Sequence, residues 1–232
     1  MAAFDWFWKA LGASSERNTK KSKGIVDKAH SRIDELSSLS DEDVSQRARA
    51  LVEGGQITDK AEFLALLTVA SQRTLGMTPF NVQNQAVLRL LEGDVIQMAT
   101  GEGKTLVGAM AATGFALTGK RTHVITVNNY LAERDAEWMR PLVEFFGLSV
   151  GAVTEKTPRE ARAEIYRRDV IYAPVTEIGF DHLRDNQITH RSQLVQAPAE
   201  VALVDEADSV LVDEASCLSC WPVRSLVCSP PA

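Results

Sequence analysis

The sequence has no cysteine before residue 217, no long apolar run and no excess of basic residues. The missing cysteines exclude a disulfide framework in this part of the chain. No run approaches the roughly 20 apolar residues of a membrane span, and residues 4–11 are too short and too charged for a secretory signal. The formal net charge of −6 excludes a global positive field for nucleic acid. We therefore expect a cytoplasmic globular protein.

The three cysteines all lie in a C-terminal segment of unusual composition, residues 216–232. Cys217 and Cys220 have the CxxC spacing of half a zinc site, but only Cys228 follows them, so we expect no zinc site. The segment also holds three of the eight prolines, no acidic residue and no helical or strand period. We expect an aberrant tail, such as an out-of-frame translation, or a genuine disordered one.

The N-terminal segment combines an aromatic helix face with positive charge. Phe4, Phe7, Trp8 and Leu11 follow the i, i+3, i+4, i+7 spacing of one helix face. Residues 1–30 carry six Lys and Arg against three Asp and Glu. Such a face suits an anionic membrane surface or a partner groove, and it equally suits a short helix docked on its own domain.

A glycine-rich loop with phosphate-binding chemistry spans Met98–Thr105. Glycines let the backbone turn tightly and direct N–H groups at phosphate oxygens, and a following helix adds its positive N-terminal end. In such loops the lysine, here Lys104, reaches the β- and γ-phosphates, and the hydroxyl, here Thr105, ligates Mg²⁺. The candidate nucleotide-binding residues here are Gly101, Glu102, Gly103, Lys104 and Thr105. The alternative, a glycine turn of a β-hairpin, is disfavoured because an Ala-rich helical stretch follows.

Two adjacent carboxylates complete the pattern at Asp205 and Glu206, directly after an apolar run. A carboxylate at a strand end holds the same Mg²⁺ as the loop hydroxyl, which assigns Asp205 to the metal. Glu206 is placed to polarise the attacking water as general base. With Lys104, Glu206 is the candidate catalytic residue of an ATP- and Mg²⁺-dependent enzyme.

Short apolar runs alternate with helical stretches beyond residue 94. Alternation of this kind predicts an α/β fold with a parallel sheet and helices on both faces. The phosphate loop and the carboxylates then meet at the carboxyl ends of strands. The predicted strands are Val95–Met98, His123–Val127, Leu148–Val153, Asp169–Tyr172 and Val201–Val204, and the predicted helices are Leu106–Leu117, Leu131–Phe146 and Pro158–Arg167.

Helices also precede this region. A capping box at Ser40–Asp43 predicts a helix towards Leu51, which Gly54 and Gly55 break. Residues 60–75 keep a helical period, and a further helix is expected from Pro79 to Leu91.

Five segments in order resemble the first nucleotide-binding domain of SecA, the preprotein-translocase ATPase family. They are Phe80–Gln83, Met98–Leu106, Val127–Asp135, Gly179–Asn186 and Val204–Ala215. Within them Asn129 and Ala207 look more like the accessory, actinobacterial type than the housekeeping type.

The resemblance implies roles for particular residues. Gln83 should read the adenine edge, because its amide both donates and accepts. Phe80 should stack on the base or pack against the following helix. Arg134, Asp135, Arg184 and Asp185 lie in segments that couple nucleotide state to neighbouring domains. For each of these four, a solvated loop charge is the more expected interpretation.

The resemblance stops at Ala215, so we expect an N-terminal helical, basic segment at 1–38, an incomplete motor domain at 39–215 and the tail at 216–232. A second nucleotide-binding domain supplies the arginine finger in this family, and losing such an arginine costs roughly 10³–10⁵ in rate. We therefore expect a truncated form with little activity alone.

The family implies preproteins and a membrane translocation channel as partners, at the inner face of the cell membrane. One alternative is a fragment of a DEAD-box RNA helicase, which the acidic composition disfavours. The other is a truncated product without function.

Overall fold

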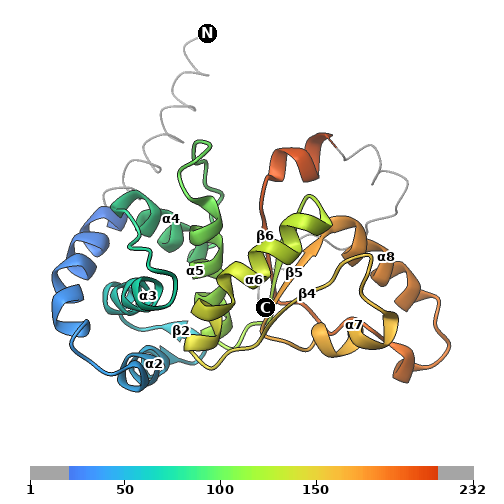
Figure 1. Cartoon of the computed structure of the whole chain (residues 1–232), viewed down its shortest axis with the longest axis horizontal. Coiled ribbons are helices and arrows are strands. Elements are labelled where there is room, and N and C mark those ends of the chain that lie inside the picture. Colours follow the sequence, from blue (N-terminus) through green and yellow to red (C-terminus); the bar gives the residue numbers. More distant parts are fainter. Residues whose placement is uncertain (1–20, 214–232) are drawn as a thin grey trace, which may run out of the picture.

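The computed structural model describes residues 21–213 (Figure 1). The aromatic helix face predicted at residues 4–11 and the cysteine-containing tail at 216–232 lie outside the described residues. Within residues 21–213, no helix is long and apolar enough to cross a membrane.

Helices form the first half of the described chain, beginning with residues 21–36. Helix α2 (Asp41–Ala50) begins at the predicted capping box, where the Ser40 side chain accepts from the Asp43 N–H. Helix α3 (Lys60–Leu75) matches its predicted bounds. Helix α4 (Asn81–Leu91) begins two residues after Pro79, because Phe80 is its N-cap.

A small hairpin joins α2 to α3 and was not predicted. Strands β1 (Val52–Glu53) and β2 (Gln56–Ile57) pair antiparallel. Gly54 and Gly55 form the turn with φ of 57° and 75°, a backbone region that glycine enters without steric cost. The glycines thus make the hairpin turn, while the helix itself already ends at Ala50.

A four-stranded sheet forms the second half, with the order β4-β5-β3-β6 and all pairs parallel. This arrangement confirms the predicted α/β class. The strands are β3 (Thr122–Thr126), β4 (Val150–Ala152), β5 (Val170–Pro174) and β6 (Val201–Val204). The helices around them are α5 (Lys104–Leu117), α6 (Asn129–Phe145), α7 (Arg159–Ile165) and α8 (Val175–Asn186), with short turns η1 (Arg191–Gln193) and η2 (Ser209–Asp213).

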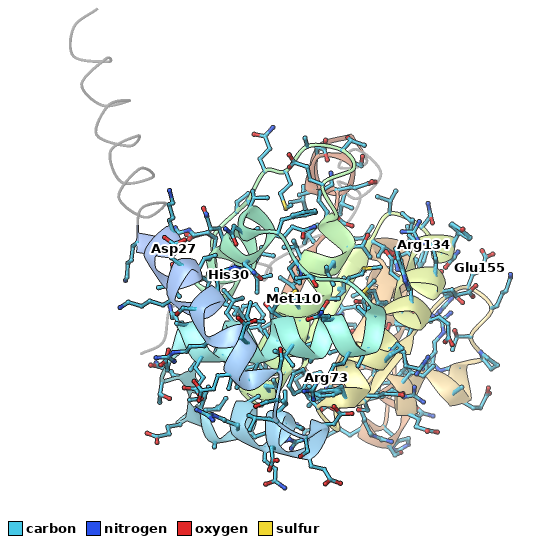
Figure 2. The ribbon with its side chains drawn as sticks, turned by 60° about the vertical axis from the view of Figure 1, so that its left-hand side comes forward. Asp27, His30, Arg73, Met110, Arg134 and Glu155 are labelled. Carbon is cyan, nitrogen blue, oxygen red and sulfur yellow. The ribbon has the colours of Figure 1, made fainter. Side chains whose placement is uncertain are left out.

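Both faces of the sheet are buried, as predicted. Val170 and Tyr172 of β5 pack in a cluster with residues of α5 and α6. Ile171 of the same strand packs on the other face, with Tyr166 and Val195. The N-terminal helices cover the outer side of α5, where Met110 is fully buried among them (Figure 2).

The predicted strand at Val95–Met98 is wrong. Residues 94–99 have no regular secondary structure, and Val95 is 96% exposed. An extended segment becomes a strand only when a neighbour satisfies its backbone groups. Within the described residues β6 pairs only with β3, so no strand reaches this segment. The apolar run at residues 95–98 therefore predicts a strand that has no neighbouring strand to pair with.

His123 of β3 is buried, and its Nε2 has no hydrogen-bond partner. Burial, with a smaller contribution from the Arg121 charge, lowers the pKa of His123 from 6.5 to about 4. Because the unfolded chain then binds this proton at higher pH than the folded chain, acid favours unfolding. The effect begins below pH 6.5 and is complete below about pH 4.

We predict that His123→Leu removes part of the acid sensitivity of folding. Between pH 7 and pH 4 the wild type should lose about 3 kcal/mol more unfolding free energy than the variant, from a pKa difference of roughly 2.5 at 1.36 kcal/mol per unit. Urea denaturation at several pH values measures this difference. Parallel pH profiles for the two proteins would show that His123 is not held neutral.

Candidate nucleotide-binding site

The phosphate loop is shaped by two glycines in the left-handed region. Gly101 and Gly103 have φ of 86° and 76°, and Gly103 is the N-cap of α5. A Cβ at Gly103 would also overlap the amide nitrogen of Gln83. The backbone angle therefore favours glycine at residue 103, and a side chain there would also displace the Gln83 amide.

The start of α5 carries donors that no protein group uses. In the part of the chain that the structure describes, the backbone N–H groups of Gly103, Lys104 and Thr105 donate to no acceptor. The Lys104 ammonium and the Thr105 hydroxyl likewise have no partner among these residues. Unpaired N–H groups at a helix N-terminus, beside a cation, form a site that suits a phosphate group.

Gln83 connects α4 to this loop. Its Oε1 accepts from the Phe80 N–H at 2.8 Å, and its Nε2 donates to the Glu102 carbonyl at 2.8 Å. The side chain is buried, at 6% exposure for the residue. One N–H and one lone pair of the amide remain for a ligand, so adenine recognition by Gln83 stays a prediction.

Glu102 and Phe80, which are also predicted to contact the nucleotide, differ in their contacts and exposure. Glu102 folds back on the loop, where its Oε2 accepts from the Ala99 N–H at 2.8 Å. Phe80 is 73% exposed, so packing against α4 leaves most of its ring free. Base stacking by Phe80 therefore stays a prediction.

The two carboxylates follow β6. The Asp205 N–H donates to the Ile125 carbonyl at 3.0 Å, which continues the ladder between β6 and β3. Asp205 Oδ1 accepts from the Glu206 N–H at 3.0 Å. Glu206 has φ of 53°, a left-handed conformation that is strained for a residue with a side chain.

Helix α5 packs against β6, and the loop before α5 and the segment after β6 both lie at the upper edge of the molecule in Figure 1. No hydrogen bond or ion pair within residues 21–213 joins the phosphate loop to Asp205 or Glu206. The fold thus places both motifs at one edge without direct contact between their side chains.

Asp135 lies within α6, in a segment that the family resemblance links to nucleotide coupling. The residue is 3% exposed, so the expected solvated loop charge is wrong for Asp135. Its Oδ1 binds the half-exposed Arg134 guanidinium at 2.7 Å. Burial raises the pKa of Asp135, the Arg134 pairing opposes this rise, and the Asp205 charge adds to it.

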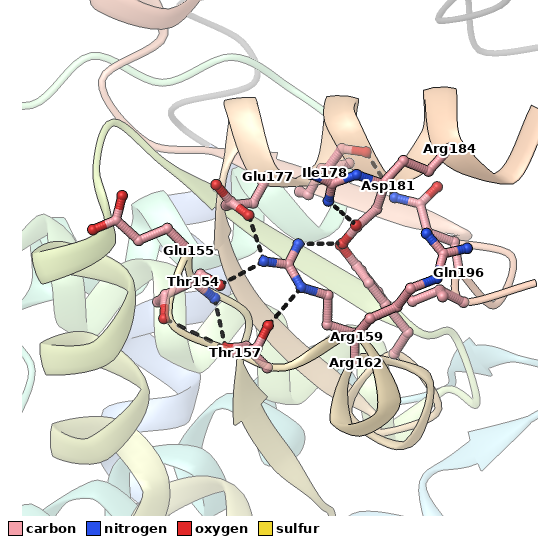
Figure 3. A network of polar contacts seen from close by, with 12 residues as sticks. Thr154, Glu155, Thr157, Arg159, Arg162, Glu177, Ile178, Asp181, Arg184 and Gln196 are labelled. Carbon is pink, nitrogen blue, oxygen red and sulfur yellow. Dashed lines mark hydrogen bonds and ion pairs between the residues drawn. The ribbon is translucent and has the colours of Figure 1, made fainter.

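A buried ionic network occupies the other face of the sheet, between α7 and α8 (Figure 3). The buried Arg162 guanidinium binds Asp181 and Glu177, each at 2.7 Å, and donates to the Thr154 carbonyl at 2.8 Å. The Tyr166 hydroxyl donates to Asp181 at 2.9 Å. Every charge in this network is paired, so the network fixes α8 against α7.

The two predicted residues at the end of α8 differ in burial. Asp185 is buried and accepts from the Val195 N–H at 3.1 Å and the Gln196 N–H at 2.8 Å. The expected solvated charge is therefore wrong for Asp185, which holds the segment before β6. Arg184 is 51% exposed at its side chain and pairs with Asp181 at 3.1 Å, so it largely meets that expectation.

The parallel sheet with a glycine-rich loop at the start of α5 belongs to the helicase-like P-loop class of α/β proteins. A hypothetical ATP-dependent RNA helicase from Sulfolobus tokodaii, known from its crystal structure, shares this fold. The match covers 66% of this chain and 45% of that chain, with a TM-score of 0.50 and 22% sequence identity. At this identity the likeness shows the fold alone.

The chain belongs to the SecA DEAD-like domain family, whose model matches residues 7–218. Protein translocase subunit SecA 2 of Corynebacterium glutamicum is 63% identical over 215 residues, which are 93% of this chain and 28% of that protein. Protein translocase subunit SecA 3 of Mycolicibacterium vanbaalenii is 51% identical over 211 residues, or 90% and 27%. The accessory type expected from the sequence fits these relatives. The chain spans less than a third of their length.

We predict opposite effects of alanine at two glycines of the same region. Gly103→Ala should destabilise the protein by roughly 1–2 kcal/mol from the left-handed backbone alone, and it should displace the Gln83 amide. Gly108→Ala, within α5 and with open space at its Cβ, should stabilise by up to about 1 kcal/mol. Urea denaturation measures both, and equal effects would contradict the described loop.

The ionic network generates a second prediction. Arg162→Met should cost about 3–5 kcal/mol of unfolding free energy, because it leaves the buried Asp181 and Glu177 without their cation. Arg184→Met should cost at most about 1 kcal/mol, since that side chain is half exposed. Similar losses in the two variants, measured by urea denaturation, would show that the network is solvated.

Proposed function

We propose that this chain binds ATP with Mg²⁺ at the start of α5 as the first nucleotide-binding domain of a SecA-type ATPase motor, with little hydrolysis by this chain alone. The observation that carries the proposal is the set of unpaired donors there: three backbone N–H groups, the Lys104 ammonium and the Thr105 hydroxyl. Membership of the SecA DEAD-like domain family supports the same activity.

The loop residues have distinct roles in this proposal. Residues 101–105 wrap the phosphates through backbone N–H groups, and Lys104 neutralises the β- and γ-phosphate charge. Gln83 reads the adenine edge from its position beside the loop, and the Glu102 carbonyl holds Gln83 in place.

Thr105 and Asp205 would hold Mg²⁺, since one hydroxyl and one carboxylate suit a cation that keeps several waters. When bound, the ion neutralises charge that develops on the phosphates. Glu206 orients and polarises the attacking water. The left-handed backbone at Glu206 supports this role, because such strain is typical of functional sites.

We further propose residues 39–215 as the motor domain and residues 1–38 as an N-terminal helical segment. In this proposal ATP hydrolysis drives preprotein export through a membrane channel, at the inner face of the cell membrane, and nucleic acid is not a partner. The names of the relatives as protein translocase subunits support the transport role. Residues 1–30, with their net positive charge, are the proposed contact with anionic lipid.

Nucleotide-dependent stabilisation tests the proposal. A ligand that binds only the folded chain adds about 2.7 kcal/mol at 100 times its Kd, so ATP with Mg²⁺ should raise the melting temperature of the wild type. Lys104→Ala should abolish most of this rise, because the phosphates lose their cation. Lys120→Ala, which removes an exposed charge after the end of α5, should keep it. A rise that survives in the Lys104 variant would refute the proposed site.

A further inference from the structure

Tyr172 of β5 is a buried tyrosine whose hydroxyl has no hydrogen-bond partner among the residues that the structure describes. Leaving such a group unpaired destabilises the folded state, so each case calls for an explanation. Tyr166, the other buried tyrosine, differs because its hydroxyl donates to Asp181 at 2.9 Å. The unpaired hydroxyl of Tyr172 is therefore not a general property of tyrosines in this core.

Strand register places Tyr172 on the side of the sheet where Asp205 emerges. Tyr172 is opposite Val124 of β3, and Val124 is opposite Leu203 of β6. Leu203 packs in the same cluster as Tyr172, between the sheet and helices α5 and α6. Asp205 comes two residues after Leu203 and continues the ladder through the Ile125 carbonyl. Because side chains alternate along a strand, Asp205 lies on the face of Tyr172.

Electrostatics agrees with the placement of Tyr172 and Asp205 on one face of the sheet. Burial raises the pKa of Tyr172 well above its ordinary value, and the charges of Asp135 and Asp205 raise it further. Asp135 is already bound to Arg134 through Oδ1 at 2.7 Å. Asp205 accepts only the Glu206 N–H, also at Oδ1, within the described residues. Each carboxylate thus keeps its Oδ2 as an acceptor for an unpaired donor, and of the two only Asp205 is the proposed Mg²⁺ ligand.

We propose that the Tyr172 hydroxyl is a positioning group for Asp205, to which it donates a hydrogen bond when Asp205 holds Mg²⁺ beside a bound nucleotide. A hydrogen bond from behind a metal-ligating carboxylate fixes the orientation of that carboxylate, and its loss typically costs 10–100-fold in metal affinity. Tyr172 does not contact the nucleotide in this arrangement. The inference rests on the proposed function, since it requires Asp205 to be the Mg²⁺ ligand.

The test compares Tyr172→Phe with wild type in the full chain, by the equilibrium affinity for ATP with Mg²⁺ and with EDTA. The variant should fold with unchanged or higher melting temperature without ligand, since only an unpaired hydroxyl is removed. Its affinity for ATP in the presence of Mg²⁺ should be 10–100-fold lower than that of the wild type. Its affinity for ATP in EDTA should equal that of the wild type. Titration with Mn²⁺, followed by electron paramagnetic resonance in the presence of ATP, should show the same loss of metal affinity.

Tyr166→Phe is the matched control. It removes the same atom from the other face of the sheet, so it should lower stability through Asp181 while keeping the full gain from Mg²⁺. If Mg²⁺ raises the ATP affinity of Tyr172→Phe as much as that of the wild type, the inference is overturned and the proposed function is not. A wild type that gains no affinity from Mg²⁺ would instead overturn the proposed function and the inference with it.

Discussion

The hydrogen bond between the Gln83 amide and the Glu102 carbonyl is the interaction on which the phosphate loop depends. The segment before the loop has no strand partner in the described residues, and Val95 is almost fully exposed. The loop is therefore held by α4 and by the start of α5, and not by a strand that precedes it. Gly103 permits this contact, because any side chain there would displace the amide. Pre-ordering the loop keeps its N–H groups directed at one place before a ligand arrives.

Buried polar groups lie on both faces of the sheet. On the face of α7 and α8, the Arg162 and Asp181 charges and the Tyr166 hydroxyl are all paired. On the face of α5 and α6, the Tyr172 hydroxyl is unpaired and Asp135 is held partly by the exposed Arg134. Fully paired groups stabilise and fix a structure, whereas incomplete pairing is expected near sites that await a ligand. His123 Nε2, on the face of Tyr166, is unpaired as well, so the Tyr172 hydroxyl is distinguished by the charges of Asp135 and Asp205 that act on it and not by its missing partner alone.

Negative charge gathers at the edge of the sheet where the candidate site lies. The Asp205 charge contributes to the raised pKa of Asp135, and Glu206 follows Asp205 in a strained conformation. Like charges that lie near one another repel, and a divalent cation relieves the repulsion. The positive start of α5, with Lys104, lies at the same edge of the molecule, so phosphate and cation would be bound by oppositely charged elements.

Local chemistry determined much of this protein from the sequence alone. The Ser40 cap, the bounds of α3, the strand Val201–Val204 and the glycine loop before α5 depend on neighbouring residues, and the structure contains them as predicted. The family motifs also identified Asp205 and Glu206 as candidates. Only the tertiary structure decided that Val95–Met98 is not a strand, that Asp135 is buried and that Tyr172 lies on the face of Asp205. These features depend on strand pairing and on packing between elements far apart in the chain, which no local pattern encodes.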